Sequence, residues 1–366
     1  MYRVRDEEKE KFVLVGLCSS SQEKEEKLYS LQELASLVDT AGGEIVEMVI
    51  QVRSRPDPAF YVGKGKLLEL AGFPGYDVLL FDDPLTPAQV RNIENLTKKK
   101  VLDRRDIILD IFATHARTKA AKIEVELAQL KFQLPRLAGR GVELSRLGGG
   151  IGTRGPGEKK LELDRRKIYK RISYLEKELE KINRTRDIQR HGRRRVFKVA
   201  LVGYTNVGKT TLLNALTHAH GDVDNRVFVT LDPLTRTGVT PSGKKFLLTD
   251  TVGFIRNIPH QLIASFRATL EEAVYADLRL VVIDASSERM DVQMEETTKI
   301  MEMLGIIDRE NLFVFNKVDM VYDPVLISGL KERFPDGVFI SAKTGEGLEE
   351  LKYAIENMME RRRVKV

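Results

Sequence analysis

The fold of this 366-residue chain is decided by Val196-Phe-Lys-Val-Ala-Leu-Val-Gly203-Tyr-Thr-Asn-Val-Gly208-Lys209-Thr210. The stretch opens with an apolar run typical of a buried strand, and Leu212, Leu213 and Leu216 follow it at helical spacing. A strand that leads through Gly-x-x-x-x-Gly-Lys-Thr into a helix is the context that a phosphate-binding loop requires. Backbone N–H groups of such a loop and of the helix start face the phosphates. We therefore expect a site for ATP or GTP in an α/β domain.

Three further segments follow this loop, each at the end of an expected strand. They are Asp250-Thr-Val-Gly253, Asn316-Lys-Val-Asp319 and Ser341-Ala-Lys343. The carboxyl ends of parallel strands lie at one edge of a sheet, so the segments should converge on one site. A carboxylate at Asp319 would accept hydrogen bonds from N1 and the 2-amino group of guanine, donors that adenine lacks. The sequence therefore favours GTP over ATP.

The motif positions also predict individual roles. Lys209 can reach the β- and γ-phosphates, and the hydroxyl of Thr210 can ligate Mg²⁺. Asp250 can hold the same ion through a water molecule, and the N–H of Gly253 can contact the γ-phosphate. The residues expected to contact the nucleotide are Gly203, Tyr204, Thr205, Asn206, Val207, Gly208, Lys209, Thr210, Phe228, Val229, Thr230, Leu231, Asp232, Asp250, Thr251, Val252, Gly253, Asn316, Lys317, Val318, Asp319, Ser341, Ala342 and Lys343.

A switch segment is expected at Arg226–Arg236, between the phosphate loop and Asp-x-x-Gly. Thr230 is the candidate for a Mg²⁺ ligand that senses the γ-phosphate, and Thr235 is its competitor. The expected catalytic residues are thus Lys209, Thr230 and Gly253, and the expected metal ligands are Thr210, Thr230 and Asp250.

Two residues bear on the rate of hydrolysis. Phe254 stands where many regulatory GTPases carry a glutamine that orients the attacking water. Phenylalanine cannot hydrogen-bond a water, so we expect slow intrinsic hydrolysis that a partner accelerates by ordering the switches. Asn206 raises the hypothesis of a K⁺ ion, because an asparagine at this place helps to bind K⁺ in related GTPases. Equal hydrolysis in Na⁺ and K⁺ would dispose of that hypothesis.

Residues 1–115 are expected to form a small α/β domain with a parallel sheet. Strands are predicted at Phe12–Cys18, Ile45–Val52, Asp77–Phe81 and Ile107–Phe112, and helices at Glu25–Val38 and from about Pro87. The turn Gly63-Lys-Gly-Lys66 could hold a phosphate, but a plain turn with exposed lysines is favoured.

Residues 116–195 are expected to form a helical hairpin arm, followed by the GTPase domain at 196–366. Apolar residues alternate at spacings of four and three along both halves of the arm, which predicts two antiparallel helices that cover each other. Pro135 should end or kink the first helix near its last turn. The two seams are Ala116, Ala120, Ile123, Leu127, Leu130, Leu134 and Leu137, and Leu161, Ile168, Ile172, Leu175, Leu179 and Ile182.

A basic, glycine-rich loop at residues 139–157 joins the two helices. Its Gly150-Ile-Gly-Thr-Arg-Gly155 is close to the dinucleotide fingerprint, but that fingerprint requires a preceding strand, and here a helix precedes it. Arg140, Arg146 and Arg154 are spaced along the loop, and arginine pairs with phosphate in bidentate fashion. We expect these three arginines to contact RNA, with a flexible hinge as the alternative.

Composition sets the broad class. The net charge is +6, and basic residues cluster at Arg184–Lys198 and Arg361–Lys365, which suits a polyanion or, equally, a solvated surface. No apolar stretch reaches the ~18 residues that span a bilayer, and the charged N-terminus is unlike a secretory signal. The single cysteine, Cys18, has no partner within the chain, which favours a reducing cytoplasm.

The chain resembles the HflX family of translation-factor-like GTPases over nearly its whole length. The specific evidence is the arm stretch Gly139–Glu158, with Phe228-Val-Thr-Leu-Asp232 and Asp250-Thr-Val-Gly-Phe-Ile-Arg256. The resemblance favours Thr230 as the switch ligand. It implies a cytoplasmic protein that binds the large ribosomal subunit and its rRNA and dissociates stalled or idle ribosomes. An N-terminal ATP site is sometimes attributed to the family, and only Gly63–Lys66 supports one here.

Two alternatives come from other functional classes. One is a GTP-controlled adaptor whose hairpin holds a protein partner or whose basic segments bind an anionic membrane surface. The other is an ATP-driven RNA helicase, which a guanine-selecting Asp319 and a single phosphate loop disfavour. We expect a monomer in which GTP and Mg²⁺ order the switches and hydrolysis favours release from the ribosome.

Overall fold

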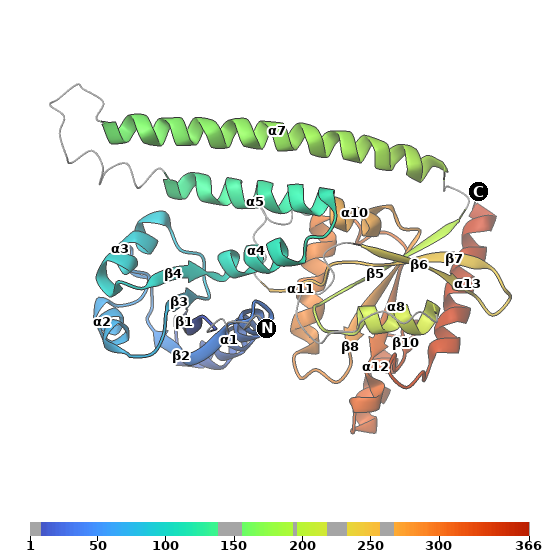
Figure 1. Ribbon diagram of the computed structural model, residues 1–366. Helices are drawn as coiled ribbons and strands as arrows, with labels where there is room; N and C mark the ends of the chain where they lie inside the picture. The colour runs from blue at the N-terminus through green and yellow to red at the C-terminus, as the bar shows by residue number, and fades with distance from the viewer. Residues whose placement is uncertain (1–8, 138–155, 193–195, 218–232, 257–266, 366) are drawn as a thin grey trace, which may run out of the picture. The chain divides into compact units, whose positions relative to one another are not determined.

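The computed structural model describes residues 9–137, 156–192, 196–217, 233–256 and 267–365 (Figure 1). The chain divides into two compact units, Met1–Thr114 with Ile123–Glu178 and His115–Lys122 with Leu179–Val366. Among the helices in the described ranges, none combines the length and the apolar character that crossing a membrane requires.

The first unit is built on a four-stranded parallel sheet in the order β2-β1-β3-β4. Strands alternate with helices along the chain, as the sequence predicted. The elements are β1 Lys11–Cys18, α1 Lys24–Thr40, β2 Glu44–Val52, α2 Lys64–Gly72, β3 Val78–Phe81, α3 Pro87–Thr97, β4 Lys100–Asp103 and α4 Arg104–His115.

The strand predicted at Ile107–Phe112 is wrong, because these residues lie inside α4. Five of the six are buried, so this stretch of helix is apolar almost all round and shows no helical period. The fourth strand is instead β4, where only Val101 is a buried apolar residue. Its four residues are too few to produce a pattern of their own.

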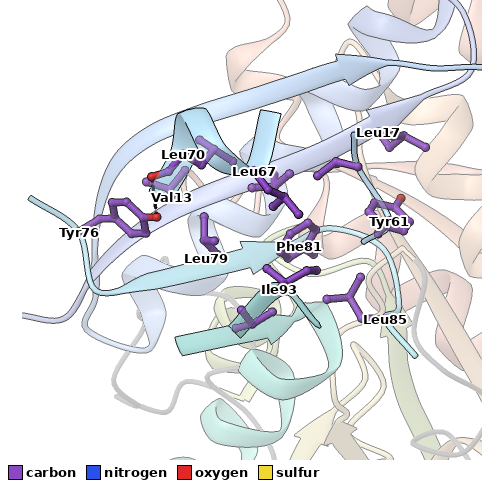
Figure 2. Close-up of a cluster of buried hydrophobic side chains, with 13 residues drawn as sticks. Val13, Leu17, Tyr61, Leu67, Leu70, Tyr76, Leu79, Phe81, Leu85 and Ile93 are labelled. Atoms are coloured by element: carbon purple, nitrogen blue, oxygen red, sulfur yellow. Dashed lines mark hydrogen bonds between the residues drawn. The ribbon is translucent and has the colours of Figure 1, made fainter. Parts of the chain in front are cut away.

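One face of this sheet carries an apolar cluster to which α2 and α3 also contribute (Figure 2). Val13 and Leu79 on neighbouring strands are fully buried, as are Leu67 of α2 and Ile93 of α3. The hydroxyl of Tyr76 donates to the carbonyl of Leu70 at 2.8 Å, so this buried ring keeps a partner for its polar end. The cluster fixes the sheet against its helices.

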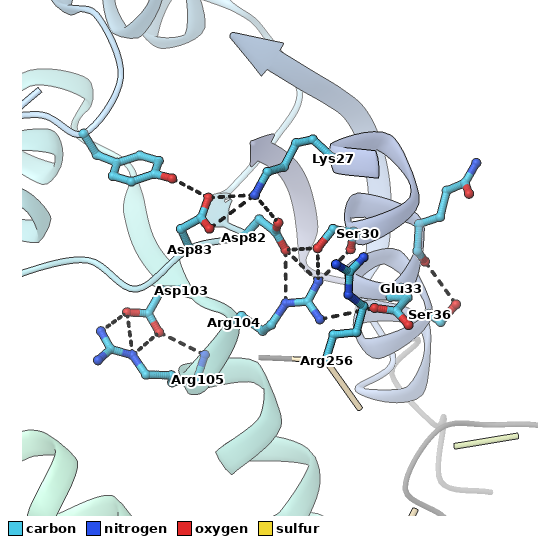
Figure 3. Close-up of polar contacts among 12 residues, drawn as sticks. Lys27, Ser30, Glu33, Ser36, Asp82, Asp83, Asp103, Arg104, Arg105 and Arg256 are labelled. Carbon is cyan, nitrogen blue, oxygen red and sulfur yellow. Dashed lines mark hydrogen bonds and ion pairs between the residues drawn. The ribbon is translucent and has the colours of Figure 1, made fainter. Parts of the chain in front are cut away.

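A charged network closes the carboxyl end of the same sheet (Figure 3). The carboxylate of Asp82, directly after β3, accepts hydrogen bonds from Arg104 at 2.6 and 3.0 Å and from Lys27 at 2.9 Å. Ser30 donates a further bond at 3.1 Å. Burial alone would raise the pKa of Asp82, but the charges of Arg104 and Lys27 outweigh it and hold that pKa below its usual range.

Replacing Asp82 with asparagine is expected to destabilise the first unit by about 3 kcal/mol, because it removes the closer of the two carboxylates, Asp82 and Glu33, that pair with the buried Arg104. Since folding lowers the pKa of Asp82, its contribution is present above the ordinary value of about 3.9 and is lost as pH falls through the lowered value. The measurement is amide hydrogen exchange in β1 and β3 at neutral pH and near about pH 3.

The control is Glu10→Gln, which removes an ion pair to Lys100 that is about half exposed on the same sheet. That change should cost less than about 1 kcal/mol. Equal effects of the two substitutions, or an Asp82→Asn effect that persists unchanged at low pH, would contradict this account.

Two long helices follow the first sheet, α5 at Lys119–Leu137 and α7 at Pro156–Gly192. In the first unit they run antiparallel (Figure 1), and Glu126 pairs with Arg171 at 2.6 Å. Leu127 and Leu175, one from each seam, are both buried. The predicted helical hairpin is therefore confirmed, and Pro135 lies in the last turn of α5, near its end.

The helix α5 is covered on a second face as well. Arg136 forms ion pairs with Asp106 at 2.7 Å and Asp103 at 3.1 Å. The ring of Phe132 lies under the guanidinium groups of Arg105 and Arg136, with 4.8 and 4.1 Å to its centroid. These contacts attach α5 to β4 and α4, and the heptad seam alone did not predict this second covered face.

The second unit contains a six-stranded sheet in the order β10-β9-β8-β5-β7-β6. All neighbouring strands are parallel except β6 and β7. Four of the predicted motifs follow β5, β7, β9 and β10, so they lie at one edge of the sheet. The elements are β5 Phe197–Gly203, α8 Lys209–Thr217, β6 Leu234–Val239, β7 Lys245–Asp250, α10 Arg267–Tyr275, β8 Leu278–Asp284, α11 Met290–Met303, β9 Asn311–Asn316, η2 Val318–Met320, α12 Pro324–Arg333, β10 Val338–Phe339 and α13 Leu348–Lys365.

Candidate functional site

The loop between β5 and α8 folds tightly around its lysine. The ammonium of Lys209 is buried and donates to the carbonyls of Gly203 at 3.1 Å and Tyr204 at 2.6 Å. An ammonium has three donors, so one remains for a ligand of the loop. Burial lowers the pKa of Lys209 to about 8, although the charge of Asp250 opposes the shift. A phosphate group would therefore stabilise the charged form of a lysine that the fold desolvates.

Asp250 ends β7 and is fully buried beside the start of α8. Its carboxylate accepts a hydrogen bond of 2.7 Å from the hydroxyl of Thr210. A hydroxyl and a carboxylate so close together offer the hard oxygen ligands that Mg²⁺ prefers, and this ion is commonly held by one or two carboxylates plus substrate phosphates. The described residues contain no cluster of three His, Cys, Asp or Glu side chains that could hold a metal alone. The donors present fit Mg²⁺ bound together with a nucleotide.

The segment after Asp250 is attached to the phosphate loop by backbone bonds. Phe254 donates to the carbonyl of Gly203 at 3.0 Å and accepts from Thr205 at 2.7 Å. A Cβ on Gly253 would lie 3.0 Å from the Lys209 ammonium and 2.9 Å from the Thr205 Cα, so the segment needs a glycine to approach this closely. The Phe254 ring is only 2% exposed, which leaves it unavailable to a water molecule.

The motifs predicted to hold the base are joined to the phosphate loop through Asn316. Its side-chain amide donates to the carbonyl of Val207 at 2.8 Å and accepts from the N–H of Ala342 at 2.9 Å. Asp319 lies exposed in η2. This short helix begins directly after Lys317, whose φ of +64° turns the chain. One buried side chain thus fixes the spacing between the phosphate end and the base end of the site.

Sequence reasoning missed Asp284, which accepts a 2.6 Å hydrogen bond from the Lys317 ammonium. The carboxylate also receives bonds from the N–H and the hydroxyl of Ser286. Asp284 ends β8, the strand between β5 and β9. Its position at the end of the Leu278–Asp284 strand is the signal that could have revealed it.

The competing switch residue Thr235 is described and lies in β6. Its hydroxyl shares a 2.9 Å hydrogen bond with that of Thr249 on β7. Thr235 therefore belongs to a strand pair rather than to the pair formed by Thr210 and Asp250. Several predicted residues lie outside the described ranges: Phe228, Val229, Thr230, Leu231, Asp232, Arg140, Arg146 and Arg154.

Comparison with known proteins identifies the family. The chain is 46% identical over 358 residues to GTPase HflX of Caldanaerobacter subterraneus subsp. tengcongensis, covering 95% of this chain and 80% of the relative. This chain belongs to the HflX family of GTPases. It is also 48% identical to GTPase HflX of Lacrimispora saccharolytica, covering 97% and 84% of the two chains. For GTPase HflX of Escherichia coli K12 the identity is 43%, with 89% and 78% covered.

Three family models divide this HflX-family chain between them. Residues 28–113 match "GTP-binding GTPase N-terminal", and residues 115–193 match "GTP-binding GTPase Middle Region". Residues 198–317 match "50S ribosome-binding GTPase". The crystal structure of SsGBP in complex with GDP is similar, with a TM-score of 0.51 and 27% identity over 96% of this chain and 99% of that one. The predicted P-loop GTPase fold is confirmed.

In this HflX-family protein, GTP binding is expected to take up a proton above about pH 8. With its pKa lowered to about 8, a part of the Lys209 population is neutral in this range, and the phosphates would favour the charged form. Affinity should therefore fall as pH rises through this range. Titration calorimetry at about pH 8.5, in buffers of different ionisation enthalpy, should show net proton uptake on nucleotide binding.

The control is Lys209→Arg, because arginine stays charged throughout this range. If the variant still binds, its proton uptake measures any contribution from the guanine ring, which is then subtracted. Binding to the wild-type chain without proton uptake would show that Lys209 does not contact the phosphates in this way.

Proposed function

We propose that this chain is a Mg²⁺-dependent GTP-hydrolysing switch of the cytoplasm that binds the large ribosomal subunit and dissociates stalled or idle ribosomes. The observation that carries the GTP site is the Asn316 bridge between the phosphate loop and the Ser341–Lys343 loop. This bridge sets the distance between the group that would bind phosphate and the groups that would bind guanine.

In this proposal each motif residue has a defined task. Lys209 binds the β- and γ-phosphates through its remaining N–H, while Thr210 and Asp250 hold Mg²⁺. The ion neutralises charge that develops on the phosphates. Asp319 accepts hydrogen bonds from the guanine edge. The N–H of Ala342, which donates to the side chain of Asn316, lies at the same end of the site. Thr230 completes the metal site as the switch ligand.

Hydrolysis should be slow in the free protein. The buried Phe254 supplies no hydrogen bond to an attacking water. A partner that repositions the switches therefore has to provide the groups that orient the attacking water. The K⁺ ion that Asn206 would help to bind stays an additional hypothesis.

The large ribosomal subunit is the partner that the observations favour. The family model matched by residues 198–317 describes a 50S ribosome-binding GTPase. Exposed basic side chains also lie along α7, among them Arg166, Lys167 and Arg184, each in a surface ion pair with an acidic residue three or four positions earlier that an RNA phosphate could replace. Arginines and lysines contact RNA phosphates, and Arg140, Arg146 and Arg154, which lie outside the described residues, are the further RNA contacts that we propose.

Large ribosomal subunits are expected to stimulate GTP hydrolysis, and the stimulation should fade as salt rises. Each phosphate contact releases a counterion, so affinity falls steeply with salt. The measurement is hydrolysis with and without purified subunits at two salt concentrations. A lack of stimulation in either salt would contradict the ribosomal role and leave the GTPase assignment intact.

The order of events has its own test. If binding energy separates the subunits before hydrolysis resets the cycle, a non-hydrolysable GTP analogue should support ribosome dissociation. Dissociation that requires hydrolysable GTP would reverse the proposed order.

A further inference from the structure

The part of α7 that belongs to the first unit exposes an aromatic ring. Tyr174 is 55% exposed, so a large part of its apolar ring is in contact with water. The neighbouring residues Ile172 and Leu175 are buried and belong to the seam of the helical hairpin. The ring of Tyr174 is therefore not needed to cover that seam, and its surface is available to a ligand.

The Tyr174 ring is supported from one face. The guanidinium of Arg171 lies over it, 5.5 Å from the ring centroid. Arg171 is itself held in place, because it donates to both carboxylate oxygens of Glu126 on α5, at 2.6 and 2.8 Å. A bidentate pair of this kind fixes the orientation of the guanidinium plane. A flat ligand would thus meet a positioned ring from the side away from Arg171.

Two lysines flank Tyr174 along α7. Lys170 precedes it by four residues and Lys177 follows it by three, the spacings at which side chains on a helix are neighbours. Both lysines are exposed, and neither forms an ion pair with any residue that the structure describes. The nearby carboxylate of Glu176 is already paired with Lys131 of α5 at 2.8 Å. The ring therefore lies between two cations that are free to bind an anionic ligand.

An exposed ring between separated cations matches the chemistry of a single-stranded nucleic acid, in which flat bases alternate with phosphates. In an RNA duplex the bases are stacked inside, so the ring could contact only an unpaired base. Lys170 and Lys177 are seven residues apart, about 10 Å along the helix, and their flexible side chains can reach phosphates on both sides of such a base.

We propose that Tyr174 stacks on an unpaired RNA base, with Arg171 supporting the ring and Lys170 and Lys177 binding the adjacent phosphates. The inference rests on the proposed binding of ribosomal RNA. It adds that this part of α7 recognises an unpaired nucleotide and not only the charge of the RNA backbone.

The first test uses Tyr174→Ala in the full chain, with a short single-stranded RNA of mixed sequence and the duplex made with its complement. Affinity for the single strand should fall about 5- to 100-fold, the range for stacking on an aromatic side chain, with an unchanged salt dependence because the ring carries no charge. Affinity for the duplex should change less than about twofold. Lys170→Gln should instead lower the slope of log affinity against log salt by about 0.7.

A second measurement observes the stacked ring itself. The chain contains no tryptophan, so Tyr174→Trp introduces its only indole ring, whose fluorescence a stacked base should quench. The matched control is Tyr169→Ala. Tyr169 is 50% exposed on the same helix, but it lies about 140° around the helix from Tyr174, and no cation lies over its ring among the described residues. That variant should bind the single strand as the wild type does.

The outcomes separate this inference from the proposed function. Wild-type affinity of Tyr174→Ala for the single strand, unchanged fluorescence of Tyr174→Trp on binding, or no binding of single-stranded RNA by the wild type would each overturn the inference. Loss of binding to large ribosomal subunits with unchanged RNA binding would assign Tyr174 to a protein contact and also overturn it. A wild-type chain that binds single-stranded RNA through Tyr174 but does not bind large subunits would contradict only the proposed function.

Discussion

Replacement of Asp319 by asparagine is expected to convert the site from GTP to xanthosine triphosphate. The carboxylate would accept hydrogen bonds from guanine N1 and the 2-amino group. The asparagine amide would place its own N–H donors against that amino group, so two donors would face each other without an acceptor. Xanthine carries a carbonyl at this ring position, which an amide can satisfy. Loss of GTP affinity should reach about 100- to 1,000-fold, because each unmatched hydrogen bond to a charged group costs a few kcal/mol.

The measurement is equilibrium binding and hydrolysis of both nucleotides by the two proteins. The matched control is Asp323→Asn, four residues away, where the carboxylate caps α12 by accepting from Val325 at 2.9 Å. That variant should keep the wild-type preference for GTP. If Asp319→Asn retains GTP affinity and ignores xanthosine triphosphate, the base must be held by another group.

Gly208→Ala is expected to abolish nucleotide binding, with a loss of at least about 100-fold. A Cβ at Gly208 would lie 2.3 Å from the side-chain nitrogen of Asn316, so the bridge to Val207 and Ala342 could not form. The backbone φ of +91° adds strain for any residue with a side chain. Both effects act where the phosphate loop meets the base end of the site.

Gly243→Ala isolates the backbone contribution. Gly243 has a φ of +85°, yet no atom lies within 4 Å of a Cβ built there. This variant should lose only about 1 kcal/mol of stability and bind nucleotide normally. Thermal unfolding and nucleotide titration of both variants decide the matter. Similar losses of affinity would mean that strain, rather than the contact with Asn316, governs Gly208.

The second unit was the more predictable from sequence, for a physical reason. The strands that carry the motifs are mostly buried and apolar, and the motifs at their ends have fixed spacings, so the convergence of Lys209, Asp250 and Asn316 followed from local pattern. Interactions between distant segments did not. The pairing of Lys317 with Asp284 depends on sheet order, which a single motif does not encode.

The first unit shows where pattern misleads. Ile107–Phe112 lies in a helix that is covered on nearly all sides, and burial of this kind erases the period that distinguishes a helix from a strand. The second covered face of α5 was equally invisible, because Arg136 and Phe132 both lie outside the heptad seam that the sequence shows. Tertiary contacts, not propensity, decide such positions.

The 37 residues of α7 form one continuous helix, with Pro156–Glu178 in the first unit and Leu179–Gly192 in the second. At a rise of 1.5 Å per residue, the helix is about 55 Å long, and its backbone hydrogen bonds continue without a break from one unit into the other. A tilt of about 5° at one end would therefore displace the other end by about 5 Å, more than the length of a hydrogen bond. Because α7 is long, a change in its direction that is too small to disturb packing at one end could move the other end far enough to make or break contacts there.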